Sequence, residues 1–132
     1  MVLVACEESG VVRDALIRRG IQAISWDILP SRSSLGEHIQ GDLIPLLSHR
    51  WTAIIAFPPC TFLSSSGLHW NKRIEGRSQK TEDALSFVEA IWNASSIVCV
   101  ENPVGAITRR LGAASQFIQP HQYGHDASKK TG

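Results

Sequence analysis

Five short apolar runs, each followed by polar or reactive residues, limit what this chain can fold into. They predict strands over residues 2–5, 21–26, 37–39, 52–57 and 97–100. Helical spacing fills two of the gaps, from Val11 to Arg19 before Gly20 and from Thr81 to about Ala94. Strands joined through helices of this length make right-handed crossovers. We therefore predict an α/β fold with a mostly parallel sheet and helices on both faces.

Finer details of the helices also follow from the sequence. Thr81 is the expected N-cap of the long helix. A short helix is expected after Asp42, and another with Asn102 as N-cap and Pro103 in the first helical position. The residues expected to face the core are Val12, Ala15, Leu16 and Arg19 in the first helix, and Ala84, Leu85, Val88, Ile91 and Trp92 in the long one.

Size and composition indicate one domain spanning residues 1–132, since 43% of the positions are hydrophobic and 19% are charged. Three cysteines, an odd number, argue against a secreted disulfide framework and favour a reducing, intracellular setting. No stretch approaches the length of a membrane span, and no metal site is predicted. The net charge of +1 names no class of partner.

Reactive side chains gather where the predicted strands end, which is the edge at which parallel sheets bind ligands. Cys60 follows two prolines, and these make a stiff turn that would hold the thiol in place. Glu101 follows an apolar run that would partly desolvate its carboxyl group and favour the protonated form. A nucleophilic thiolate and a protonated acid are the pair needed to add to an electron-poor heteroaromatic ring while protonating a ring nitrogen.

Each of these residues also has a structural interpretation. Cys60 would be an inert small hydrophobe, as most lone cysteines are, and Glu101 would be a helix-capping carboxylate beside Asn102. Cys99 lies within an apolar run and is expected in the core. Cys6 is a weaker candidate nucleophile, because the acids around it would raise its pKa.

A polar segment from Ser64 to Lys80 separates Cys60 from the long helix, and we expect it to form a loop. Its Ser64, Lys72, Arg73 and Arg77, together with Lys129 and Lys130 near the end of the chain, are candidates for contacts with nucleic-acid phosphates. His69 or Trp70 would stack on a base or fill the gap that it leaves. The alternative is a solvated surface loop and a disordered terminus.

The motifs at the strand ends resemble those of a known family. PPC at residues 58–60 and EN at 101–102 look like the catalytic motifs of the cytosine-5 DNA methyltransferases. QYGH at 122–125, followed by Lys129-Lys130-Thr131, resembles a later motif in which a Tyr-Gly turn precedes basic residues. The strings ACEESG, DILP, HIQGD, PPCTFLSSSG, ENPVG and QFIQPHQYGH are similar, in this order, to short cytosine methyltransferase-like proteins carried by phages and prophages. The resemblance runs from Val2 to Thr131.

This resemblance implies a Rossmann-like methyltransferase fold and transfer of a methyl group from S-adenosylmethionine to C5 of cytosine in DNA. It also implies a cytoplasmic location, in a bacterium or a phage-infected host cell. Cys60 would attack C6 of a flipped-out cytosine, and Glu101 would protonate or hydrogen-bond N3. Pro59 and Asn102 complete the two catalytic motifs. The residues implied to hold the cofactor are Cys6, Glu7, Ser9, Gly10, Asp27, Ile28, Asp42 and Pro58, with Asp27 toward the ribose and Asp42 toward the adenine amine.

The chain departs from the family in two places. Gly10 is the only glycine of CEESG, where the family has several glycines and an aromatic residue, so Glu7 or Glu8 would pair with the amino or sulfonium group of the cofactor. Family enzymes also continue beyond the point that corresponds to Gly132. We expect a C-terminally truncated catalytic domain without a separate target-recognition domain. DNA sequence specificity is then absent, comes from a protein partner or a second copy, or lies in a portion of the protein beyond Gly132.

Two other functions stay open. One is an amino-group methyltransferase, whose catalytic turn reads Asp or Asn, Pro, Pro and an aromatic residue; Phe57 and Cys60 disfavour it. The other is a catalytically degenerate methyltransferase-fold protein that binds DNA, the cofactor or a protein partner.

Overall fold

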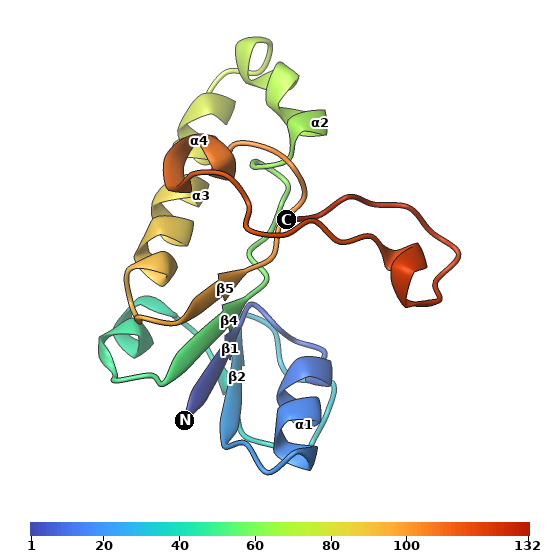
Figure 1. The fold of residues 1–132 in the computed structure, drawn as a ribbon. Helices are drawn as coiled ribbons and strands as arrows, with labels where there is room; N and C mark the ends of the chain where they lie inside the picture. Colours follow the sequence, from blue (N-terminus) through green and yellow to red (C-terminus); the bar gives the residue numbers. More distant parts are fainter. The chain divides into compact units, whose positions relative to one another are not determined.

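The computed structural model describes all residues from Met1 to Gly132 and confirms an α/β fold with an all-parallel sheet (Figure 1). Its strands are β1 (Val2–Ala5), β2 (Ala23–Asp27), β3 (His38–Gln40), β4 (Ala53–Ala56) and β5 (Val98–Val100), in the order β3-β2-β1-β4-β5. The α-helices are α1 (Val11–Arg18), α2 (Ser65–Leu68), α3 (Arg77–Trp92) and α4 (Ile107–Leu111). Three 3₁₀ helices are η1 (Ile44–Ser48), η2 (His69–Lys72) and η3 (Pro120–Tyr123).

The chain forms two compact units. The first, residues 1–58 and 90–100, contains the whole sheet, and the second comprises residues 59–89 and 101–132. In the first unit β1 lies between β2 and β4, so that Leu3 pairs with Ile24 on one side and with Ile54 on the other. All three side chains are buried. The strand order reverses direction beside β1, and such a switch point is where open parallel sheets place ligands.

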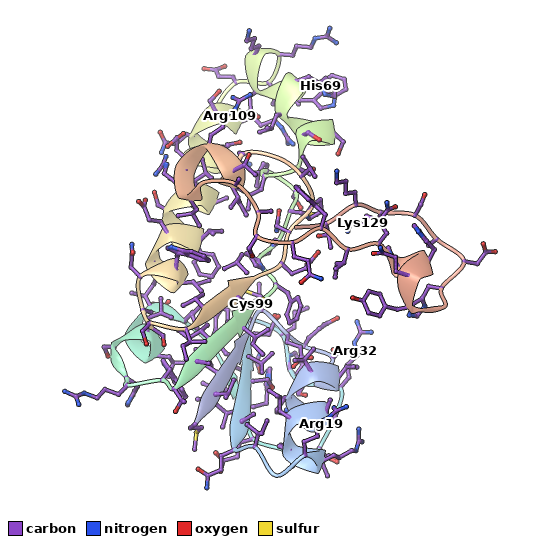
Figure 2. All side chains as sticks on the ribbon, viewed as in Figure 1. Arg19, Arg32, His69, Cys99, Arg109 and Lys129 are labelled. Carbon is purple, nitrogen blue, oxygen red and sulfur yellow. The ribbon has the colours of Figure 1, made fainter.

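Helix α1 follows β1 in the first unit and contacts β2. It ends as expected before Gly20, whose φ of 77° suits a residue without a side chain. The predicted inner face is wrong only in part, because Val12, Ala15 and Leu16 are half-buried. The buried residues are Arg13 and Asp14, whereas Arg19 is exposed (Figure 2). The reason is that the two charges pair with each other, which is the condition under which such side chains become buried.

The second unit corrects the prediction for residues 64–80, which are mostly helical rather than a loop: they form α2, η2 and the start of α3. Helix α3 begins at Arg77, directly after Gly76 with its φ of 75°. Thr81 is therefore not an N-cap but lies within the helix, where its buried hydroxyl donates to the carbonyl of Phe62 at 2.9 Å. Leu85, Val88 and Ile91 are buried as predicted, whereas Trp92 is 42% exposed.

The helix expected at Asn102 and Pro103 begins only at Ile107. Residues 102–103 instead pair with the end of the chain: Pro103 bridges Thr131, and Asn102 exchanges two backbone hydrogen bonds with Gly132, each of 3.1 Å. In this antiparallel pairing the backbone N–H and C=O groups of Asn102 are bonded to Gly132, so they are not available for the first turn of a helix. No helix combines the length and apolar character that crossing a membrane requires.

Candidate functional site

In the first unit the loop from β1 to α1 carries several of the predicted cofactor residues. Cys6 adopts a φ of 58°, a left-handed conformation that is uncommon for a residue with a side chain and tends to occur at functional sites. Glu7 is buried, and its two carboxylate oxygens accept from the amides of Val12 at 2.5 Å and Arg13 at 3.2 Å. Glu7 thus caps α1.

Gly10 is fixed by space as well as by conformation. Its φ is 74°, and a Cβ atom would lie 2.6 Å from Arg13 Nη2 and 2.9 Å from Ser33 Cβ. The hydroxyl of Ser9 accepts from the amide of Val11 at 3.3 Å and donates to Glu7 Oε1 at 3.4 Å. The one glycine of this loop therefore stands where any side chain would displace its neighbours.

The loop between β2 and β3 is tied to the loop that follows β1. Arg32 donates its amide to the carbonyl of Glu8 at 2.8 Å, and the two side chains form an ion pair. Both carboxylates thus already have partners within the chain, and the pairing of Glu7 or Glu8 with the cofactor stays a prediction. Asp27 Oδ1 accepts from the amide of Leu29 at 2.9 Å, and the neighbouring Ile28 is 68% exposed.

The two remaining predicted site residues of the first unit are Asp42 and Pro58. Asp42 is exposed and its Oδ1 accepts from the amide of Ile44 at 3.0 Å, so it does bond the start of the short helix η1 as expected. Pro58 is buried beyond the end of β4.

Burial raises the pKa of the Cys6 thiol to about 12, and the carboxylate of Asp27 adds to the rise. The thiol therefore stays neutral at physiological pH. This agrees with the prediction that Cys6 is a poor nucleophile, although burial contributes more than the acidic neighbour does.

Sequence reasoning missed a buried polar network beneath these loops. The guanidinium of Arg13 donates to Asp14 Oδ1 at 2.8 Å, to Ser25 Oγ at 2.9 Å and to the carbonyl of Ser33 at 3.1 Å. The hydroxyl of Ser33 and then Arg13 hold the pKa of Asp14 below its usual range. Because Ser33 lies in the β2–β3 loop, its hydrogen bond with Arg13 fastens that loop to helix α1. The serine-rich run at 31–34 was the only sequence signal for it.

In the second unit Cys60 lies at the start of a tight turn and is half-buried. Its carbonyl accepts from the amides of both Leu63 and Ser64, each at 3.0 Å. Pro59, directly before it, is exposed. The backbone on both sides of the thiol is therefore restricted, as the two prolines led us to expect.

The segments that follow Cys60 and Glu101 brace each other within this unit. Ser65 donates its amide to the carbonyl of Val104 at 2.9 Å, and Ala106 donates to that of Leu63 at 2.7 Å. Between them Ser64 and Gly105 form an antiparallel bridge. A Cβ atom on Gly105 would lie 1.9 Å from the carbonyl oxygen of Leu63, so only glycine permits this approach.

Glu101 is half-buried, and its Oε1 accepts a hydrogen bond from the hydroxyl of Thr131. The alternative in which Glu101 caps a helix beside Asn102 is wrong, because α4 begins at Ile107 and has Ala106 before it. Thr131 is buried, and sequence reasoning gave it no role at the site. Local pattern carried no signal for a partner so far along the chain.

The candidates for nucleic-acid contacts differ in the hydrogen bonds and ring contacts that their side chains already make within the protein. Arg77 donates to the carbonyl of Thr61 at 3.0 Å and lies over the ring of Phe62, with its guanidinium carbon 4.9 Å from the centroid. It thereby supports the turn that follows Cys60. Ser64 Oγ lies 3.1 Å from Ser66 Oγ.

The other four basic candidates are all exposed: Lys72, Arg73, Lys129 and Lys130. Arg73 lies over the ring of Trp70, and Lys130 lies over that of Phe117. His69, at the start of η2, and Lys129 are drawn in Figure 2. Lys72 and Lys129 are therefore the two basic candidates without such a ring contact.

Fold and strand order define an α/β protein with an all-parallel sheet, consistent with a Rossmann-like fold. A comparison with protein-family models gave no match, and a search of curated proteins found no similar sequence. The assignment of a function therefore rests on the residues and their geometry.

Proposed function

We propose that this chain is an S-adenosylmethionine-dependent DNA cytosine-5 methyltransferase. The observation that carries the proposal is the pair Cys60 and Glu101. They follow neighbouring parallel strands, β4 and β5, whose ends pair as Ala56 with Val100. The segments after the two residues are braced by the hydrogen bonds around Gly105. A thiol and a carboxyl group held in this way suit covalent addition to a pyrimidine ring.

In the proposed reaction the Cys60 thiolate forms a bond to C6 of the cytosine. Glu101 holds a proton at N3, which draws electron density out of the ring as C6 is attacked. C5 then becomes nucleophilic and takes the methyl group that S-adenosylmethionine supplies when bound. The C5 proton then passes to water, and the electrons of the C5–H bond restore the C5–C6 double bond. The C6–S bond breaks, its electrons leave with Cys60 as thiolate, and the proton at N3 returns to Glu101. The base must leave the helix first, which costs a few kcal/mol for an intact pair.

The residues at the ends of β1, β2 and β3 fit such a cofactor. Asp27 has one carboxylate oxygen beyond the one that the amide of Leu29 occupies, and that oxygen would bind the ribose hydroxyls. Ile28 offers an exposed apolar surface for the adenine ring, and Asp42 an acceptor for its amine. The backbone of residues 6–10, which turns at Gly10 with its φ of 74°, would approach the methionine part, on a side other than the one that Arg13 and Ser33 fill.

Trapping of the covalent adduct tests the proposal. The chain is incubated with S-adenosylmethionine and DNA in which 5-fluorocytosine stands between randomised flanks, as single and double strands. Fluorine at C5 cannot leave as a proton does, so Cys60 would remain attached to the base. We expect an adduct in denaturing gels and mass spectra for the unaltered chain. We expect none for Cys60→Ala.

Two further variants sharpen this test. Cys99 is exposed on β5 (Figure 2), so the expectation that it lies in the core is wrong. Cys99→Ala should leave the adduct unchanged. Glu101→Gln should slow methylation by about 10²–10⁴-fold, the usual contribution of a general acid, while calorimetry shows unchanged cofactor affinity. Cofactor binding without any adduct would overturn the proposal in favour of a degenerate methyltransferase fold that binds DNA, cofactor or a protein partner.

A further inference from the structure

The hydroxyl of Thr131 is the side-chain group that holds Glu101 in place. Thr131 is buried and donates to Glu101 Oε1. Its backbone is fixed on both sides, because it bridges Pro103 and exchanges hydrogen bonds of 2.9 and 3.0 Å with Ile118. The next residue, Gly132, is fastened to Asn102 in the same way. The donor cannot follow the carboxyl group if that group turns.

We propose that Thr131 is a positioning residue for Glu101, an inference that rests on the proposed methyltransferase reaction. A threonine hydroxyl has one proton to donate. Since that proton is directed at Oε1, a protonated Glu101 would carry its own proton on Oε2. Oε2 is then the atom presented to the ring nitrogen of the base. Holding one rotamer also removes the entropy that would otherwise be lost as the base is protonated.

The structure explains why this role falls to the distant end of the chain. Residues 118–131 belong to the second unit and form a long loop near the red end of the ribbon (Figure 1), and the two ends of this loop, Ile118 and Thr131, pair with each other. The returning strand lies between Pro103 and Ile118. Thr131 thus sits beside the segment that directly follows Glu101, and a short hydroxyl at this position reaches the carboxyl group.

Two substitutions separate the hydroxyl from the rest of the side chain. Thr131→Val keeps the shape and removes the donor, and Thr131→Ser keeps the donor. With saturating DNA and S-adenosylmethionine, we expect Thr131→Val to lower the single-turnover rate roughly two- to tenfold, the value of a hydrogen bond between neutral groups. The KM for DNA and the cofactor affinity should be unchanged. Thr131→Ser should recover most of the rate.

A double variant shows whether Thr131 acts through Glu101. If it does, Glu101→Gln with Thr131→Val should be about as slow as Glu101→Gln alone, because residues in one hydrogen-bonded unit are not additive. Two results would overturn the inference. One is a double variant whose loss of rate equals the product of the two single losses, and the other is a Thr131→Val rate equal to that of the unaltered chain. Should Thr131→Val fold poorly in thermal unfolding, Thr131→Ala against Thr131→Ser makes the same comparison.

Failure of this inference and failure of the proposed function give different results. If the unaltered chain forms no Cys60 adduct, the proposed function fails and the role of Thr131 in it fails too. If the adduct forms and Thr131→Val reacts normally, the inference about Thr131 fails alone.

Discussion

The substitution Gly105→Ala tests whether the hydrogen bonds between the segments that follow Cys60 and Glu101 hold these segments together. The new Cβ atom would lie 1.9 Å from the Leu63 carbonyl oxygen and 2.8 Å from Ser64 Cα. Both are backbone atoms, so no side chain can turn aside to make room. The segments must move apart, and the hydrogen bonds Ser65–Val104 and Ala106–Leu63 would break.

The expected cost follows from these contacts. Two backbone hydrogen bonds contribute about 1 kcal/mol each, and the forced backbone shift adds about 1–3 kcal/mol. The free energy of unfolding should thus fall by about 3–5 kcal/mol, a large share of the usual 5–15 kcal/mol. Gly76→Ala is the matched control in the same unit, because its site is open and only the positive φ penalises a side chain. It should cost about 1–2 kcal/mol.

Urea unfolding measures the two costs, and amide hydrogen exchange locates the damage. In Gly105→Ala the amides of Ser65 and Ala106 should lose protection, while the amide of Leu3 in the sheet keeps it. Formation of the Cys60 adduct should fall at the same time. The reasoning would be refuted if Gly105→Ala unfolded at the same urea concentration as Gly76→Ala and kept both amides protected.

Three further predictions concern the first unit. Asp14→Asn should lower stability above the ordinary carboxyl pKa of 3.8, because the folded pKa is depressed; in urea titrations the difference from the unaltered chain should vanish as pH falls through the folded value. Iodoacetamide at pH 8 should label exposed Cys99 and spare Cys6, of which only about one molecule in 10⁴ is thiolate, as peptide mass mapping would show. Gly10→Ala should cost at least about 1–2 kcal/mol in urea unfolding, because its φ is positive and Arg13 occupies the space.

The sheet could be predicted because its signal is local. Each strand is a short apolar run, and a parallel sheet buries such runs on both faces. The positions of Cys60 and Glu101 followed from the same pattern, since they come after the fourth and fifth runs. Ends of strands were less certain: β2 begins at Ala23, not Ile21, and includes Asp27.

Capping rules failed where a residue had a stronger partner elsewhere in the fold. Thr81 has the composition of an N-cap around it, with acids at the next two positions, but its hydroxyl serves the carbonyl of Phe62. Asn102 and Pro103 resemble a helix start, but their backbone pairs with residues 131–132. A local pattern gives a propensity of a few tenths to about 1 kcal/mol, and one buried tertiary hydrogen bond is enough to outweigh it.

The supporting residues of the site were invisible for a related reason. Arg13 looks like a surface charge in an amphipathic helix until Ser25 and Ser33 supply acceptors for it. Gly105 and Thr131 act through atoms that lie far along the chain, at Leu63 and Glu101. The motif therefore points to Cys60 and Glu101, the groups that we propose to react, and the sheet topology fixes where in the chain they stand. The hydrogen bonds that orient these groups join irregular segments. Irregular segments have no periodic pattern that could be recognised in the sequence. It follows that a sequence which kept Cys60 and Glu101 but lost Gly105 or Thr131 would still show the motif and would no longer hold its two groups in place.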